Sequence, residues 1–138
     1  MKTFETVDIS GDAGIRAYGR TVEDVFVNTA LGMYSLITDL EEIKEQKEVP
    51  VNVESHSLEG LIVSWLNELI FLFDTVGFIG RKINIKTFRN NRITAGVRGE
   101  DFDPERHERR LLIKAATYHQ LSIAKENGFW VANVIFDI

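Results

Sequence analysis

The sequence predicts an α+β domain in which two helices pack on a mostly antiparallel sheet. Residues 22–37 and 58–75 repeat apolar side chains at helical spacing, each after a capping residue. The other apolar segments alternate like strands and are joined by short turns, as is typical of antiparallel pairing. The order strand, helix, then strands occurs twice, which is consistent with an internal duplication.

The N-terminal part is expected to contain two short strands and the first helix. Residues 4–8 and 15–19 alternate weakly, and residues 9–14 between them hold two glycines and two turn-forming polar residues. Thr21 is a helix N-cap, with Asp24 at the third helical position as in a capping box. The first helix is therefore expected to begin just after Thr21.

The middle of the chain is expected to contain an edge strand and the second helix. A charged connection over residues 41–48 leads to a strand at 49–53, and Pro50 places this strand at a sheet edge because proline cannot donate a ladder hydrogen bond. Ser57 caps the second helix, and Gly77 ends it.

The second half of the chain is expected to consist of strands. Residues 111–125 are expected to form one long strand, with or without a bulge, because they are rich in apolar residues, threonine and tyrosine. The other expected elements are strands at 82–88, 93–98 and 129–138, turns at 89–92 and 126–128, and a polar loop at 100–108.

Composition restricts the class of protein. The chain has 138 residues, of which 44% are hydrophobic, and this is enough apolar material for one domain over residues 1–138. Its net charge of -5 argues against stable direct binding to nucleic acid. The longest apolar run, residues 61–73, is shorter than the ~20 residues of a membrane span. The chain has no cysteine, and we expect a cytoplasmic protein.

The end of the chain suggests a cation site. The last strand is apolar, and it ends on the side-chain carboxylate of Asp137 and the main-chain carboxylate of Ile138. Asp8 and Asp12 flank a tight turn near the start. A hard cation such as calcium or magnesium prefers carboxylate, carbonyl and water oxygens. The alternative is that a turn aspartate bonds its own backbone and that a terminal aspartate is simply solvated.

No other pattern indicates catalysis. The three histidines, His56, His107 and His119, lack the spacing of metal ligands, and no acid–base pair or phosphate loop is present. Basic residues gather at positions 106–110. We favour a solvated face offset by neighbouring glutamates, and a docking patch for an acidic surface is the alternative.

Ten segments together resemble the archease family. They are residues 15–21, 30–33, 38–39, 65–69, 73–74, 97–100, 102–108, 113–115, 117–119 and 134–138. The resemblance covers essentially the whole chain, in order. It implies a duplicated strand-helix-strand-strand module with one copy inserted in the other.

The resemblance also implies a function. Archeases are non-enzymatic cofactors of the tRNA-splicing RNA ligase that uses GTP, and they promote guanylylation and turnover of that ligase. The family binds a metal through an aspartate of the first turn, the penultimate aspartate and the terminal carboxylate. Carried over, these are Asp12, Asp137 and Ile138. We expect a divalent cation, calcium first, with magnesium or manganese as alternatives.

One position departs from the family pattern. The first turn of the family typically reads Asp-His-Thr-Ala-Asp, whereas residues 8–12 place Ile9 where the histidine stands. Metal binding or activity can differ here if that histidine is a ligand. Two other functions remain open from the sequence: a small metal-dependent phosphoesterase and a chaperone-like binding module. The roles of Asp8, His107, Lys114 and His119 are not assigned.

Overall fold

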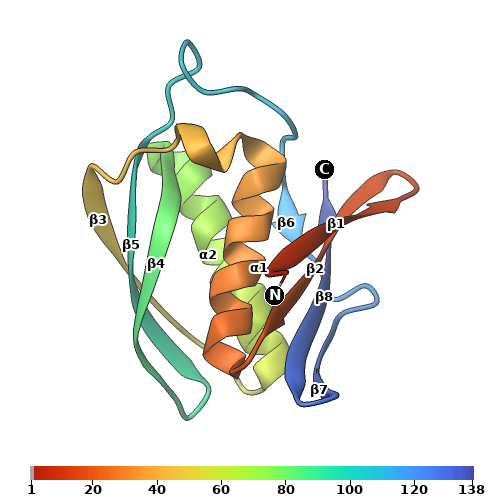
Figure 1. Ribbon diagram of the computed structural model, residues 1–138. Coiled ribbons are helices and arrows are strands. Elements are labelled where there is room, and N and C mark those ends of the chain that lie inside the picture. Colours follow the sequence, from red (N-terminus) through yellow and green to blue (C-terminus); the bar gives the residue numbers. More distant parts are fainter. Residues whose placement is uncertain (1) are drawn as a thin grey trace.

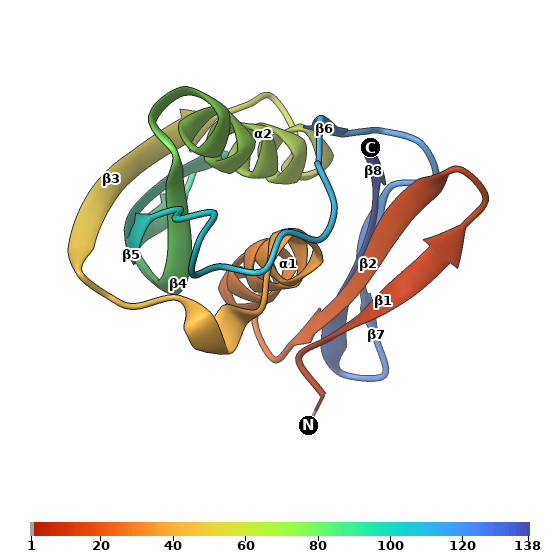
Figure 2. The ribbon, with the colours of Figure 1, turned by 90° about the horizontal axis from the view of Figure 1, so that it is seen from above.

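The computed structural model describes residues 2–138 and places two helices between two antiparallel sheets (Figure 1, Figure 2). The α+β class is confirmed, but the strands form two sheets instead of one. The first sheet consists of β1 (Phe4–Ile9), β2 (Asp12–Gly19), β8 (Phe129–Asp137), β6 (Ala115–Ala116) and β7 (Ser122–Glu126). The second consists of β3 (Lys47–Glu54), β5 (Arg92–Asp101) and β4 (Phe78–Arg89). Met1, the first residue of the predicted domain, lies outside the described residues.

Two sheets form because α1 (Val22–Ile37) is apolar on more than one side. Its Gly32 lies against Ile15 of β2 in the first sheet. Its Phe26 meets Phe88 of β4 edge to face, with 4.9 Å between ring centroids, in the second. The helix α2 (Leu58–Val76) is joined to α1 by the indole of Trp65, which donates a 3.0 Å hydrogen bond to the Phe26 carbonyl. Both sheets and both helices therefore share one buried core.

The two sheets repeat one topology. In the second, residues 47–101 run β3-α2-β4-β5, and the strands lie in the order β3-β5-β4. In the first, β2-α1-β7-β8 lies in the order β2-β8-β7, with β1 added at the edge. In each unit the last strand lies in the middle. It pairs on one side with the strand before the helix and on the other with the strand that follows the helix. The second unit lies between α1 and β6 in the chain, as expected for one copy inserted in the other.

The predicted helix ends are confirmed by their caps. The hydroxyl oxygens of Thr21 and Ser57 accept hydrogen bonds from N–H groups in the first turns of α1 and α2. Gly77 ends α2 in the left-handed region at φ 72°, and its N–H donates to Phe73 at 3.0 Å. A short 3-10 helix, η1 (Leu40–Glu42), follows α1. Within residues 2–138, neither helix is long and apolar enough to cross a membrane.

The predicted strand over residues 111–125 is wrong. Only Ala115–Ala116 and Ser122–Glu126 are strands, and Gln120 takes a left-handed turn at φ 50° between them. The N–H groups of Arg110 and Leu111 bond the Ile37 and Leu36 carbonyls at 2.9 and 3.0 Å. These carbonyls at the end of α1 would otherwise lack partners, so this segment completes a helix terminus instead of a sheet.

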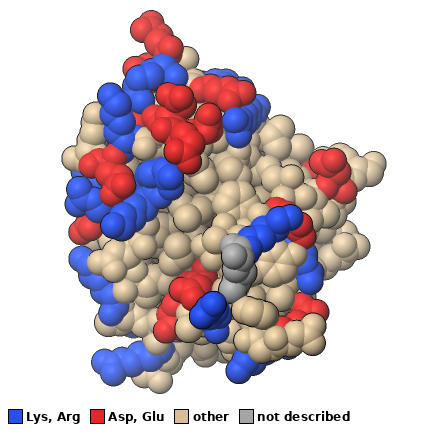
Figure 3. Space-filling view, in the orientation of Figure 1, with Lys and Arg blue, Asp and Glu red and all other residues tan. Residues whose placement is uncertain are grey.

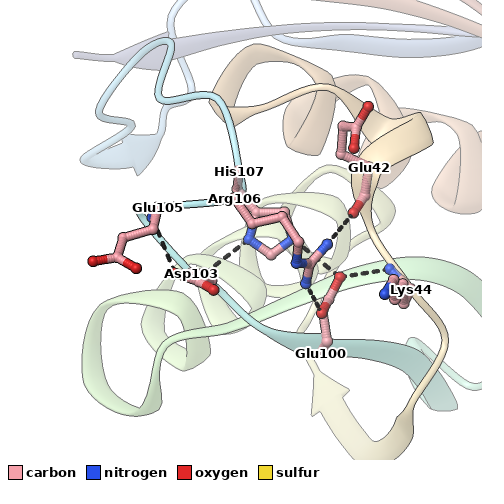
Figure 4. A network of polar contacts seen from close by, with 7 residues as sticks. All are labelled: Glu42, Lys44, Glu100, Asp103, Glu105, Arg106 and His107. Atoms are coloured by element: carbon pink, nitrogen blue, oxygen red, sulfur yellow. Dashed lines mark hydrogen bonds and ion pairs between the residues drawn. The ribbon is translucent and has the colours of Figure 1, made fainter.

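A buried polar cluster holds the start of this segment (Figure 4). The Glu100 side chain, 3% exposed, accepts hydrogen bonds from the Lys44 N–H (2.6 Å), from Arg106 and from His107 (3.0 Å). The His107 Nδ1 accepts the Asp103 N–H at 2.8 Å. The imidazole proton must therefore be on Nε2, which donates to Glu100. We call Glu100, Arg106 and His107 the Glu100 clamp.

The clamp sets the protonation of its carboxylate. Burial of Glu100 would raise the pKa of its carboxyl group, but hydrogen bonds from the Lys44 N–H, His107 and Arg106 favour the charged form and lower the pKa overall. Glu100 therefore contributes stability that is fully present above the pKa of an unfolded glutamate, 4.5, and is lost as the pH falls through the lower folded-state value.

Replacing Glu100 by glutamine tests this contribution. At pH 7 we expect Glu100→Gln to lower the free energy of unfolding by about 1–3 kcal/mol, because charged hydrogen bonds are lost in a buried site. Denaturant melts of both proteins between pH 7 and 3 should show the difference shrinking as the pH falls from 4.5 through the lower folded-state pKa, because the unfolded wild type binds a proton at this group before the folded protein does. A difference that stays constant over this range would contradict the assignment.

A close strand contact gives a second prediction. Gly99 pairs with Gly80, and a Cβ at Gly99 would lie 2.0 Å from the Ile79 carbonyl oxygen. Gly99→Ala should therefore lower the free energy of unfolding by about 1–3 kcal/mol through overpacking. Gly14→Ala is the matched strand control, because its nearest neighbours would lie at 3.4 Å. Equal urea midpoints for the two variants would refute the steric argument.

Candidate metal site

The β1–β2 hairpin positions the first candidate ligand. Gly11 takes φ 79°, a conformation that favours glycine, and this allows the tight turn between the strands. Ile9 and Asp12 form the cross-strand pair next to the turn. The turn is therefore shorter than the predicted one over residues 9–14, and Asp12 is the first residue of β2 instead of a turn residue.

The β2–β8 ladder brings the second candidate to the same place. The last pair in this register is Ala13 with Phe136, so the next step places Asp12 beside Asp137. Side chains alternate between the faces of a strand. Ile15 faces the buried helix α1. Asp12 is three residues away along β2, so its side chain lies on the opposite, outer face of the sheet. Its neighbour Asp137 lies on the same outer face. The register thus unites residues from the two ends of the chain.

The end of β8 is also held on its other side. Ala115 of β6 pairs with Asp137, and the Lys114 N–H donates a 2.8 Å hydrogen bond to the Asp137 carbonyl. The side chain of Asn67 on α2 in turn accepts the Ala116 N–H at 2.8 Å. The main chain at Asp137 is therefore fixed by neighbouring strands, and Ile138 follows directly.

The two carboxylates lack a cationic partner in the described part of the chain. Adjacent cross-strand residues have Cβ atoms about 5 Å apart, and like charges at that position are destabilising. No ion pair and no hydrogen bond within residues 2–138 uses the Asp12 or Asp137 carboxylate. The alternative that Asp12 hydrogen-bonds its own backbone in the turn therefore does not hold. We call Asp12 and Asp137 the acid pair.

The donors at this place are oxygens. Within residues 2–138, no three side chains of histidine, cysteine, aspartate or glutamate gather in a metal-binding group. A cation at the acid pair would need further oxygens, and the Ile138 carboxylate and water are the candidates beside it. This donor set fits a hard cation that accepts mixed oxygen ligands.

Asp8 and Ile9 are close to Asp12 in sequence, but they lie on opposite faces of β1. Asp8 pairs with Ala13 and therefore lies on the inner face of the sheet, opposite to the face of Asp12. The structure therefore does not bring Asp8 together with the acid pair. Ile9 lies directly across from Asp12 on the outer face. A histidine in place of Ile9 would stand beside the acid pair, so this chain lacks a nitrogen donor that the family pattern offers there.

The remaining candidates lie apart from the acid pair or play structural roles. His56 and His119 are exposed, and His107 is buried in the Glu100 clamp. Of the basic residues at 106–110, Arg106 bonds Glu100 and Arg110 pairs with Glu108 at 2.9 Å. The clamp was not predicted, because Glu100 reads as one more acid of a polar loop and nothing in its spacing indicates burial.

Comparisons with known proteins identify the family of this chain. A model of the Archease protein family (MTH1598/TM1083) matches residues 4–138. Relatives called protein archease include one from Methanosarcina mazei, 38% identical over 99% of this chain and 97% of its own, and one from Sulfolobus acidocaldarius, 34% identical over the full length of both.

Two solved structures have the same fold. The solution structure of Methanobacterium thermoautotrophicum protein 1598 superposes with a TM-score of 0.85 at 36% identity and covers both chains completely. A crystal structure of an archease from Thermotoga maritima, described as a possible chaperone, has a TM-score of 0.64 at 19% identity, covers 100% of this chain and 98% of its own, and supports the fold alone. With the family match over nearly its whole length, this chain belongs to the archease family.

Proposed function

We propose that this protein is a non-enzymatic, metal-binding cofactor of a GTP-dependent tRNA-splicing RNA ligase in the cytoplasm. Membership in the archease family is the reason for naming the ligase. The observation that carries the metal part is the register that sets Asp12 beside Asp137 on an outer face, where neither has a cationic partner among residues 2–138.

Asp12, Asp137 and the Ile138 carboxylate would hold the cation. Calcium is our first choice because it accepts oxygen ligands in flexible geometry, whereas magnesium demands a near-ideal octahedron; magnesium and manganese follow. When bound, the cation supplies positive charge that can neutralise and orient phosphate groups. The residues themselves contribute rigidity: strands on both sides of β8 fix the main chain at Asp137, so little order has to be gained on binding.

The acid pair suits a cofactor better than an independent phosphoesterase. Across the sheet, the register places Ile9 and Ala115 on either side of the acid pair. Neither side chain can act as a nucleophile or general base. A binding module that acts without metal is the other alternative, and metal-dependent stability separates it from the proposal.

Charge removal at the acid pair tests the site. A saturating divalent cation should raise the melting temperature of the wild type, since an ion at 100 times its Kd adds about 2.7 kcal/mol. Asp12→Asn and Asp137→Asn should lose this shift and lower the stimulated rate of ligase guanylylation at least about tenfold, the effect of about 1.4 kcal/mol. The measurements are differential scanning fluorimetry with calcium, magnesium and manganese, and single-turnover guanylylation.

Asp8→Asn is the matched control. It removes the same charge four residues from Asp12 but on the opposite face. It should keep both the thermal shift and the stimulation. Stimulation without any thermal shift in the wild type would favour the metal-free module, and equal losses in all three variants would show a general effect of charge.

Changing the terminal carboxylate gives a separate test. A chain amidated at Ile138 by semisynthesis loses one negative oxygen ligand but no side chain. We expect a weaker thermal shift with calcium and weaker ligase stimulation, whereas the same chain extended at its N-terminus should keep both. If the amidated and free-acid proteins titrate calcium with the same Kd, Ile138 does not bind the ion.

A further inference from the structure

The outer faces of the two sheets differ in chemistry. The outer face of the second sheet is a row of charges, visible at the left of Figure 3. Its charged residues are Lys82, Lys86, Arg89, Arg92, Arg98, Glu48 and Glu54. Several of them pair with each other, as Arg92 and Glu54 do at 2.6 Å. Such a face is well solvated and needs no partner.

The outer face of the first sheet carries few charges and large apolar groups. The register puts Val7 of β1, Gly14 of β2 and Ile135 of β8 side by side on it, next to the acid pair. Farther along, Phe129 and Val131 lie on the same face of β8. Val7 and Phe129 remain 37% and 41% exposed. Both helices lie on the other side of this sheet, so neither covers these groups (Figure 2).

A fixed polar belt crosses this face. Arg16 donates to the Tyr18 hydroxyl (3.0 Å), the Asn133 side-chain oxygen (2.9 Å) and Glu126 (3.3 Å). Tyr18 in turn donates to Glu5 at 2.6 Å. The belt therefore ties β1, β2, β8 and β7 together. Its acids have cationic partners, because Glu126 pairs with Arg16 at 3.3 Å and Glu5 pairs with Lys2 at 3.0 Å. A surface held in this way loses little conformational freedom when another molecule binds.

Two hollows lie on either side of the belt. The one nearer the acid pair, about 170 Å³, is lined mainly by apolar groups that include Val7, Ile9 and Ile135. The other, about 490 Å³, is lined by Tyr18, Phe129, Val131 and the charged residues of the belt. Tyrosine, arginine and large apolar groups beside shallow hollows are the composition of protein-binding centres.

We propose that the outer face of β1, β2, β8 and β7 is the surface that docks the RNA ligase. It fits a protein surface with an apolar ridge for the two hollows, next to a bound cation or basic side chains that meet the acid pair. This inference rests on the proposed function and adds the contact surface to it. The acid pair and the hollows share one face, so one partner surface reaches both.

The charges on this face favour a protein over an RNA strand. The charges of the belt are paired, Arg16 with Glu126 and Glu5 with Lys2, and the acid pair adds two negative charges at one end. RNA binding depends on an excess of lysine and arginine, and this face offers no such excess even when a bound cation offsets the acid pair. The second sheet carries more cations, but they lie on the other side of the molecule.

The test places lysine at the two exposed apolar positions. The double variant Val7→Lys/Phe129→Lys should bind the ligase from the same organism with a Kd at least tenfold higher than the wild type, by biolayer interferometry. It keeps Asp12, Asp137 and the belt. The control Phe71→Lys/Val76→Lys changes two apolar residues of α2 that are 55% and 62% exposed, and it should bind like the wild type. Melting temperatures and the calcium-induced thermal shift are measured for both, to show that the fold and acid pair are intact.

The outcomes separate this inference from the proposed function. Weaker binding of the Val7/Phe129 variant, with a normal calcium shift, supports the docking surface. A wild-type protein that binds and stimulates the ligase, together with an unchanged Val7/Phe129 variant, overturns the surface and leaves the function standing. A wild-type protein that neither binds nor stimulates the ligase overturns the function itself. Loss of single-stranded RNA binding with unchanged ligase binding would assign the face to RNA and overturn the proposal.

Discussion

The pairing of β2 with β8 is the contact on which the rest of this molecule depends. It joins segments that are far apart in the chain, as the hydrogen bond between Arg16 and Asn133, 117 positions apart, shows. The same ladder forms the surface on which α1 packs, places Asp12 beside Asp137 and aligns the belt on the outer face. A shift by one residue would exchange the two faces of β8 and would put Asp137 toward the helices.

The inserted unit supports this ladder from the other side of the helices. Its sheet covers α1 and α2, and the segment after β5 returns to the first sheet across the top of the molecule (Figure 1). Three kinds of contact guide that return: the Glu100 clamp, the N–H groups donated to the end of α1, and the Asn67 side chain at Ala116. Buried polar contacts of this kind specify one path for a segment that has little secondary structure of its own.

Local signals accounted for much of the fold. The helix ends depend on hydrogen bonds between a capping residue and backbone groups a few residues away. They can therefore be predicted from the sequence, as at Thr21, Ser57 and Gly77. The turn at Asn90 and Asn91, with φ of 54° and 56°, is likewise local. The failures are nonlocal. Leu111 looks like the start of a strand, but its N–H bonds the Leu36 carbonyl of α1. Glu100 looks like a surface acid, although His107 and Arg106 enclose it.

Both helices, most strands, the α+β class and the family to which the chain belongs could be predicted from the amino-acid sequence. It also named Asp12 and Asp137 as candidate ligands. Three features became visible only in the fold: the strands divide into two sheets, Asp8 and Asp12 lie on opposite faces, and the acid pair shares its face with the hollows. The physical reason is that caps and turns depend on neighbours in sequence, whereas faces and sheets depend on the register between distant strands.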